Sequence, residues 1–155
     1  MMLELDDEVQ DEFHLFGVQT AITDETKFIF LLNNAFHWKL QRIPDLDVTF
    51  KDETFCYSTY LYEDPHNLED YVYVIKNQSH DKRMDKVENS LFQDVALNKS
   101  RPLLNKYKTF RYLIKLPIET DSLPIKHLTL PSVDFIYNIQ PIEITSNKEK
   151  KYFLI

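Results

Sequence analysis

The chain contains a single glycine, Gly17, in 155 residues, whereas average usage of about 7% would give about eleven. Loops that cradle phosphates need several glycines, because their backbone must approach the ligand in conformations that other residues resist. The sequence therefore has no P-loop, no GxGxxG dinucleotide turn and no GxSxG nucleophile elbow. The enzyme classes that depend on these loops are excluded, which leaves a binding module as the main interpretation.

The composition is that of one folded, acidic domain over residues 1–155. Hydrophobic residues make up 43% of the chain and aromatic residues 14%, which is enough for a core of its own. The net charge of −7 repels the phosphates of nucleic acids and anionic lipid surfaces. We therefore expect no membrane partner, and we regard nucleic acid as an unlikely partner.

Charge is unevenly distributed along the chain. The tail over residues 146–155 is basic, and the lead-in over residues 1–12 is acidic. The carboxylates of the lead-in are Glu4, Asp6, Asp7, Glu8, Asp11 and Glu12. Such a run is usually a solvated segment, and the alternative is a docking tail for a basic partner.

Cys56 is the one cysteine of the chain, so no intramolecular disulfide can form and no thiolate cluster can hold zinc. Its position within a predicted strand favours a small buried hydrophobe over a nucleophile. The N-terminus lacks a basic region followed by an apolar one, and the densest apolar run, 28–32, is too short to span a bilayer. We expect a cytoplasmic protein without a cofactor.

The hydrophobic periodicity predicts one main helix and several strands. Thr23 and Asp24 are good N-cap residues, and the positions that follow at helical spacing form an apolar stripe of about three turns. This stripe consists of Phe28, Leu31, Leu32, Ala35 and Phe36. Strands are expected over residues 13–20, 38–43, 48–51, 55–62, 71–77, 109–116 and 133–139.

Turn residues place several of these strands. Pro44 should end the second strand, because proline cannot donate to a ladder. The short connection over residues 63–67 makes the strands 55–62 and 71–77 antiparallel neighbours. In the strand 109–116, we expect Phe110 and Tyr112 to share a face.

The fold that follows is α+β: a mostly antiparallel sheet of about six strands with one main amphipathic helix packed on one face. Residues 79–107 are polar, and we expect them to form an irregular segment, called the excursion below, with a short helix near 84–95. A helix of three turns cannot cover six strands. Part of the sheet is therefore left for the excursion, another subunit or a partner.

The end of the predicted helix carries polar residues that invite two interpretations. Asn33 and Asn34 are mediocre helix formers, so they either face solvent near the helix end or hydrogen-bond to pin the helix to a loop. His37 lies where a protonated imidazole complements the helix dipole.

The strand and helix sequences resemble the IPExxxVDY family of uncharacterised bacterial proteins. The resemblance rests on the segments 13–18, 28–33, 40–47, 60–64 and 74–77, and near the C-terminus on 111–114 and 133–135. The sequence departs from the eponymous signature, because Leu130-Pro131-Ser132 precedes Val133 directly. The resemblance implies one α+β domain in a bacterial cytoplasm, and it implies no activity and no catalytic residue.

Tyrosines on the two neighbouring central strands are the main functional candidates. Tyrosine offers rigid apolar area with a polar tip and is enriched at protein interfaces. The candidate partner-binding residues are Tyr57, Tyr60, Tyr62, Tyr71 and Tyr73. The alternative is cross-strand packing within the domain. The leading hypothesis is a non-enzymatic interaction module that docks a protein partner or a second copy, so that Tyr60→Ala or Tyr62→Ala weakens association without unfolding.

Two other functions compete with docking. A small-molecule site or enzyme could use a pocket between the sheet and the 79–107 excursion, with His80, Arg111 or Asp134 as converging polar groups. Nucleic-acid binding ranks third, because a groove of Lys and Arg is missing. Asp64, His66, Glu69 and Asp70 could supply metal ligands, but turn chemistry accounts for them, so neither a metal nor a catalytic residue is assigned.

Overall fold

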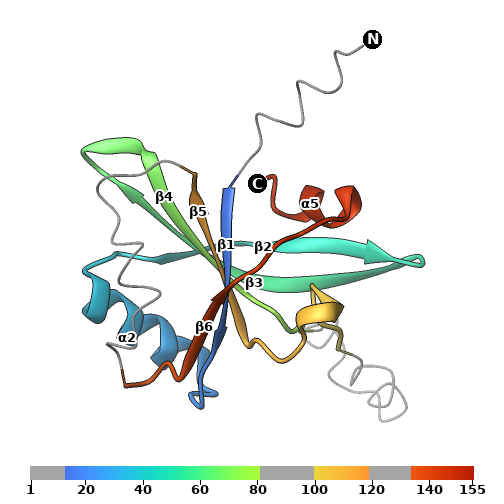
Figure 1. Ribbon diagram of the computed structural model, residues 1–155, viewed down its shortest axis with the longest axis horizontal. Helices are drawn as coiled ribbons and strands as arrows, with labels where there is room; N and C mark the ends of the chain where they lie inside the picture. The colour runs from blue at the N-terminus through green and yellow to red at the C-terminus, as the bar shows by residue number, and fades with distance from the viewer. Residues whose placement is uncertain (1–12, 81–99, 119–133) are drawn as a thin grey trace, which may run out of the picture.

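The computed structural model describes residues 13–80, 100–118 and 134–155, except for the side chains of residues 67–69. This part of the chain forms a six-stranded antiparallel sheet with one main helix (Figure 1). The elements are β1 (Phe13–Gln19), α2 (Glu25–Phe36), β2 (Gln41–Phe50), β3 (Glu53–Asp64), β4 (Asn67–Lys76), η2 (Asn105–Tyr107), β5 (Tyr112–Pro117), β6 (Asn138–Pro141) and α5 (Asn147–Tyr152). The predicted α+β fold class is confirmed.

The strand order is β2-β3-β4-β5-β1-β6, and every pair of neighbours is antiparallel. β1 lies between β5 and β6, which explains why it is apolar on both faces. β3 and β4 are neighbours as expected, with Tyr60 opposite Val74. The sheet is strongly twisted, so that β2 and β3 cross the direction of β1 at a wide angle (Figure 1).

Helix α2 begins where the capping residues predict. The Asp24 side chain accepts a hydrogen bond from the backbone N–H of Lys27 at 3.2 Å, which satisfies one of the free donors of the first turn. The helix ends at His37, whose left-handed backbone (φ 60°) forms the C-cap. His37 therefore takes the cap conformation that glycine usually provides.

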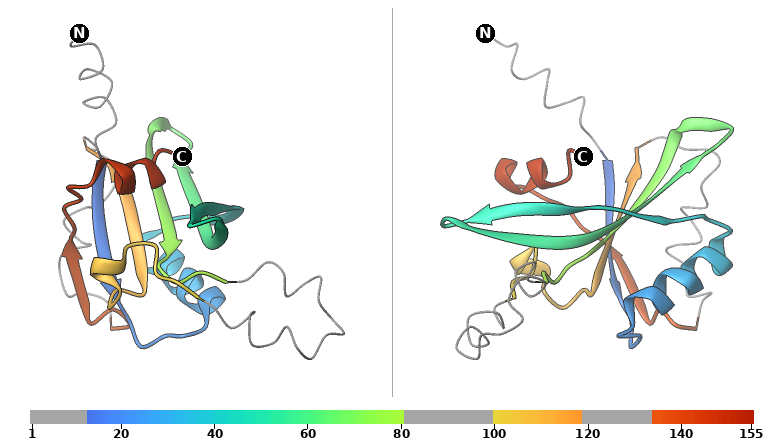
Figure 2. Two further views of the ribbon diagram at one scale, coloured as in Figure 1. Left: turned by 90° about the vertical axis from the view of Figure 1, so that its right-hand side faces the viewer. Right: turned by 180° about the vertical axis from the view of Figure 1, so that it is seen from behind.

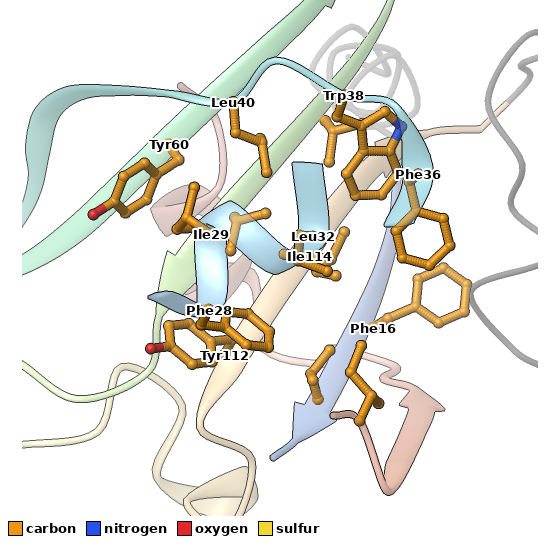
Figure 3. Close-up of a cluster of buried hydrophobic side chains, with 14 of the residues drawn as sticks. Phe16, Phe28, Ile29, Leu32, Phe36, Trp38, Leu40, Tyr60, Tyr112 and Ile114 are labelled. Carbon is orange, nitrogen blue, oxygen red and sulfur yellow. The ribbon is translucent and has the colours of Figure 1, made fainter. Parts of the chain in front are cut away.

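The buried stripe of α2 is rotated from the predicted one. Ile29 is buried with Phe28, Leu32 and Phe36, whereas Ala35 is exposed. The helix is apolar at both 29 and 31, so the periodicity allows either stripe. Packing on the sheet selects the one centred on Phe28 and Leu32, and the Phe28 ring stacks on Tyr112 with the centroids 4.1 Å apart (Figure 3).

Pro44 does not end a strand, and this prediction is wrong. β2 runs through Pro44 as far as Phe50, and its register with β3 shifts between Ile43 and Leu46. The two strands predicted on either side of Pro44 are thus one edge strand with a bulge. Proline is tolerated there because an edge strand has one side without ladder partners and a bulge leaves a residue unpaired.

The hairpins form without glycine. Lys51 and Asp52 connect β2 to β3 with positive φ values of 51° and 71°. A two-residue hairpin turn whose twist matches that of the strands requires a positive φ at both of its residues. At the β3–β4 turn, the His66 backbone N–H donates to the Asp64 carboxylate at 2.8 Å. The turn chemistry predicted for this connection is therefore present.

The last two strands start later than predicted. β5 begins at Tyr112, so Phe110 precedes the strand and packs on the opposite face from Tyr112, contrary to expectation. β6 covers only Asn138–Pro141, because the chain turns around residues 134–135. Residue 133 and the predicted helix near 84–95 lie outside the described residues.

Gly17 lies in β1 opposite Leu113. Because it has no side chain, it leaves space beside the strand. A Cβ built at this position would stand 2.5 Å from the Phe110 ring. The single glycine thus lets an aromatic ring pack directly on a central strand. Its role is a close approach of ring to backbone, since Gly17 has no positive φ.

The sheet separates two hydrophobic cores. The helix-side core, beneath α2, contains Phe16, Val18, Phe28, Ile29, Leu32, Phe36, Trp38, Leu40, Tyr60, Val72, Val74, Tyr112, Ile114, Leu116 and Ile136 (Figure 3). The tail-side core contains Leu15, Val48, Tyr57, Ile75, Leu103, Leu104, Phe110, Leu113, Ile142 and Phe153. Helices α2 and α5 lie on opposite sides of the strand crossing (Figure 2).

Candidate functional site

The five candidate tyrosines are divided between the two faces of the sheet. Tyr60 belongs to the helix-side core, and the partly buried Tyr62 packs against it. Tyr57 belongs to the tail-side core, and Tyr73 lies opposite Lys115 on that same face, with Tyr71 packed beside it. A single partner surface therefore cannot contain all five.

Tyr57 and Tyr60 are core residues in this arrangement. Tyr57 has no exposed surface and Tyr60 is only 9% exposed. The Tyr60 hydroxyl donates a hydrogen bond to the Glu25 carboxylate. Burial, followed by this bond, raises the pKa of Tyr60 to about 12. Tyr60→Ala would remove core packing and a hydrogen bond, so it cannot separate docking from folding.

Tyr71 and Tyr73 form a half-buried aromatic pair at the tail-side face. Their rings meet edge to face at 5.5 Å. The Lys115 ammonium lies 5.4 Å from the Tyr71 ring and 5.1 Å from those of Tyr73 and Phe13. Lys115 is itself buried and donates to the backbone carbonyl of Phe153. These contacts replace part of the water that a buried ammonium loses.

The C-terminus completes this surface. The Tyr73 hydroxyl donates to the Ile155 carbonyl at 3.4 Å, while the residues Leu154 and Ile155 are each 47% exposed. We define the C-terminal patch as Phe13, Tyr71, Tyr73, Leu154 and Ile155. It joins half-buried rings to two exposed aliphatic side chains.

A network of charged side chains lies at the start of α2. Glu25 meets Arg42 at 3.7 Å and Lys76 at 3.8 Å. Arg42 also pairs with Asp45, whose other carboxylate oxygen is 2.8 Å from His80 Nε2. The network ties α2, β2 and β4 to the segment after β4. Its exposed members are screened by solvent, so its contribution to stability is small.

His80 thus has a partner that the sequence did not indicate. Asp81, its neighbour in the chain, lies outside the described residues. Asp45 is 35 positions away in the chain, and the bulge of β2 brings it to His80. No local sequence pattern indicates that Asp45 and His80 meet, because their pairing depends on the register of β2 against β3.

The other predicted site residues do not meet at His80 in the described ranges. Arg111 donates through Nε to the Thr20 carbonyl at 3.3 Å, and Asp134 is exposed in a turn. No group of three potential metal ligands occurs among the described residues; the Glu69 side chain lies outside them. Within those same ranges, no helix is long and apolar enough to span a bilayer.

Two buried donors remain without a hydrogen-bond partner on the tail-side face of the described structure: the Tyr57 hydroxyl and Arg101 Nε. The Arg101 guanidinium lies 3.8 Å over the Phe50 ring. Burial raises the pKa of Tyr57, and the nearby Arg101 charge partly opposes this. Arg101 belongs to the segment interpreted as an excursion, and sequence reasoning did not single it out.

Comparison with protein-family profiles, with curated proteins and with solved structures finds no match to this chain. The resemblance to the IPExxxVDY family therefore stays a prediction. The candidate sites rest on the geometry of this chain alone.

Proposed function

We propose that the protein is a non-enzymatic interaction module that docks a protein partner through the C-terminal patch. The observation that carries this proposal is the junction of the half-buried Tyr71–Tyr73 pair with the exposed Leu154 and Ile155. Exposed aliphatic side chains beside anchored rings are the composition of an interface centre. Anchored rings also lose little conformational entropy when a partner binds.

The acidic lead-in that precedes Phe13 in the sequence favours a partner that carries basic groups, whereas the tail over residues 146–155, which ends in Leu154 and Ile155, is itself basic. Phe13, a member of the patch, is joined directly to the lead-in over residues 1–12 and its six carboxylates. A tethered acidic segment raises the rate of encounter with a basic surface and discriminates against acidic ones. Because the net charge is −7, a second copy is disfavoured by long-range repulsion.

The test is a pair of double and single variants compared with the unaltered chain. Leu154→Ser with Ile155→Ser removes the exposed part of the patch, and Phe30→Ser is the control, because Phe30 is 59% exposed on α2 at the other face. Each variant is immobilised and used to retain proteins from a cell lysate, and its mass in solution is measured by light scattering.

We expect the unaltered chain and Phe30→Ser to retain the same basic proteins, and the double variant to lose them while keeping its unfolding midpoint. Equal retention by all three chains would refute docking through the patch. If the unaltered chain and Phe30→Ser have the mass of a dimer and the double variant has the mass of a monomer, the partner at the patch is a second copy of the chain and not a basic protein.

A small-molecule site between the sheet and residues 79–107 is the second candidate function. One observation favours it: Tyr57 on the sheet and Arg101 in that segment each bury an unpaired donor on the same face. Buried donors without acceptors are rare in folded proteins. A bound acceptor would account for both.

A further inference from the structure

The Tyr57 hydroxyl and Arg101 Nε share one environment on the tail-side face. Tyr57 packs in the tail-side core, against which Phe50 and Tyr152 also pack. The Arg101 guanidinium stacks on Phe50, and the Phe50 and Tyr152 rings meet edge to face at 5.9 Å. Both Arg101 and Tyr152 act electrostatically on the Tyr57 phenol. The two unpaired donors therefore lie within the same aromatic surroundings.

The chain holds both groups in place without any ligand. Tyr57 is in the middle of β3 and is paired with Leu46. The Arg101 backbone is clamped to Ser79: its N–H donates to the Ser79 hydroxyl at 2.9 Å and its carbonyl accepts from the Ser79 N–H at 3.1 Å. Such fixed donors need little reorganisation to bind an acceptor.

The chemistry of the pair selects the ligand. Burial raises the pKa of the Tyr57 phenol and keeps it neutral, so its hydroxyl can donate. Arg101 adds an N–H donor and a permanent positive charge. No carboxylate of the described residues is among the groups that act on Tyr57. Two donors and one charge, walled by the Phe50 and Tyr152 rings, match a carboxylate attached to an apolar body.

We propose that Tyr57 and Arg101 bind a small organic carboxylate, whose oxygens accept from the Tyr57 hydroxyl and Arg101 Nε while its apolar part lies against Phe50 and Tyr152. This inference rests on the second candidate function and is independent of the C-terminal patch. It assigns a ligand class and two recognition residues to the region between the sheet and residues 100–104.

The experiment is a titration of the full chain with sodium benzoate, with sodium chloride at equal ionic strength as the blank. The readout is the ¹H–¹⁵N spectrum. The Arg101 Nε–H signal, assigned by its loss in Arg101→Lys, reports on the site in chains that keep Arg101, and the backbone amide signals report benzoate binding in every variant, Arg101→Lys included. The site variants are Tyr57→Phe and Arg101→Lys. Their matched controls are Tyr112→Phe, another buried tyrosine with an unpaired hydroxyl but on the helix-side face, and Arg111→Lys.

We expect benzoate to shift the Arg101 signal saturably in the unaltered chain and in Tyr112→Phe. Since a hydrogen bond to a charged group is involved, binding should weaken about tenfold or more in Tyr57→Phe and in Arg101→Lys, and stay unchanged in Arg111→Lys. Without benzoate, Tyr57→Phe should unfold at the same or a higher urea concentration, because the substitution removes an unpaired buried hydroxyl.

Each contrary result overturns a defined statement. Benzoate binding that survives both site substitutions would keep the small-molecule function and refute this site. Absence of any saturable shift would refute the carboxylate inference, and so would a lower urea midpoint for Tyr57→Phe, because the hydroxyl would then have a partner within the chain. None of these outcomes bears on retention by the C-terminal patch.

Discussion

The two faces of the sheet are covered in different ways. The helix-side core is closed mainly by α2, a continuous helix of 12 residues. The tail-side core is closed by separate pieces: Leu103 and Leu104, Phe110, Ile142 and Phe153. A helix satisfies its own backbone hydrogen bonds, whereas irregular cover must find partners elsewhere. The comparison teaches that the tail-side face depends more on individual side chains.

One asparagine on each side makes this difference concrete. Among the described residues, the Asn33 side chain hydrogen-bonds to Leu40 alone, accepting from its N–H at 2.9 Å and donating to its carbonyl at 3.5 Å. Asn77 accepts from the Leu104 N–H at 3.1 Å and donates to the carbonyls of Tyr107 and Phe110 at 3.0 Å. Asn33 pins the end of a helix, as the second interpretation of its sequence position requires, and Asn77 organises a whole irregular segment.

The largest expected effect comes from the tail. Phe153 is fully buried, so Phe153→Ala should lower the free energy of unfolding by about 3–5 kcal/mol. Amide exchange should then accelerate across α5 while α2 keeps its protection. Urea unfolding and hydrogen exchange measure the two effects, and equal loss of protection in α2 and α5 would contradict independent cover of the faces.

Removal of the asparagine side chain should destabilise the protein more on the tail-side face than on the helix side. Asn77→Ala leaves three backbone groups without their partner, two of them in buried hydrogen bonds, and should cost about 2–4 kcal/mol, whereas Asn33→Ala should cost about 1–2 kcal/mol. Asn33→Asp is a control, because a carboxylate keeps the shorter bond from the Leu40 N–H. If urea unfolding gave Asn33→Ala the larger cost, the comparison would be reversed.

Gly17→Ala tests the close approach of Phe110 to β1. The added methyl group meets the ring at 2.5 Å, and overpacking of this kind should cost about 1–3 kcal/mol. Combining it with Phe110→Leu should recover part of the loss, since the clashing ring is removed. A double-mutant cycle with no coupling would show that the strand shifts instead.

The smallest effect is a pH dependence of stability from Tyr60 on the helix-side face. The pKa of Tyr60 is about 12 in the folded chain against 10.0 for the free side chain. A raised pKa means that the folded state favours the neutral phenol, so this stability is complete below pH 10 and is lost as pH rises toward 12. Tyr60→Phe should flatten the decline of the urea midpoint over this window. Identical pH profiles for the two chains would count against the raised pKa of Tyr60, and so against its burial together with the Glu25 contact.

Local sequence signals predicted the parts of the fold that depend on neighbouring residues. The strand 13–20, the Asp24 cap, the helix and the β3–β4 hairpin were all predictable, because periodicity and turn chemistry act within a few residues. The bulge at Pro44 was not, since whether proline is tolerated depends on β2 being an edge strand. The sequence predicted five tyrosines for one partner surface, but their division between the faces leaves only Tyr71 and Tyr73 of the five in the proposed patch.

The sequence by itself determined an α+β fold, because alternation along strands and a helical stripe are encoded locally. It also excluded glycine-rich nucleotide loops, because one glycine cannot build them. Only the tertiary structure decided which groups meet: Asp45 with His80, Lys115 with the Phe153 carbonyl, and Arg101 with Phe50. These contacts join residues distant in the chain, and strand order, register and the path of the C-terminal segment set their positions.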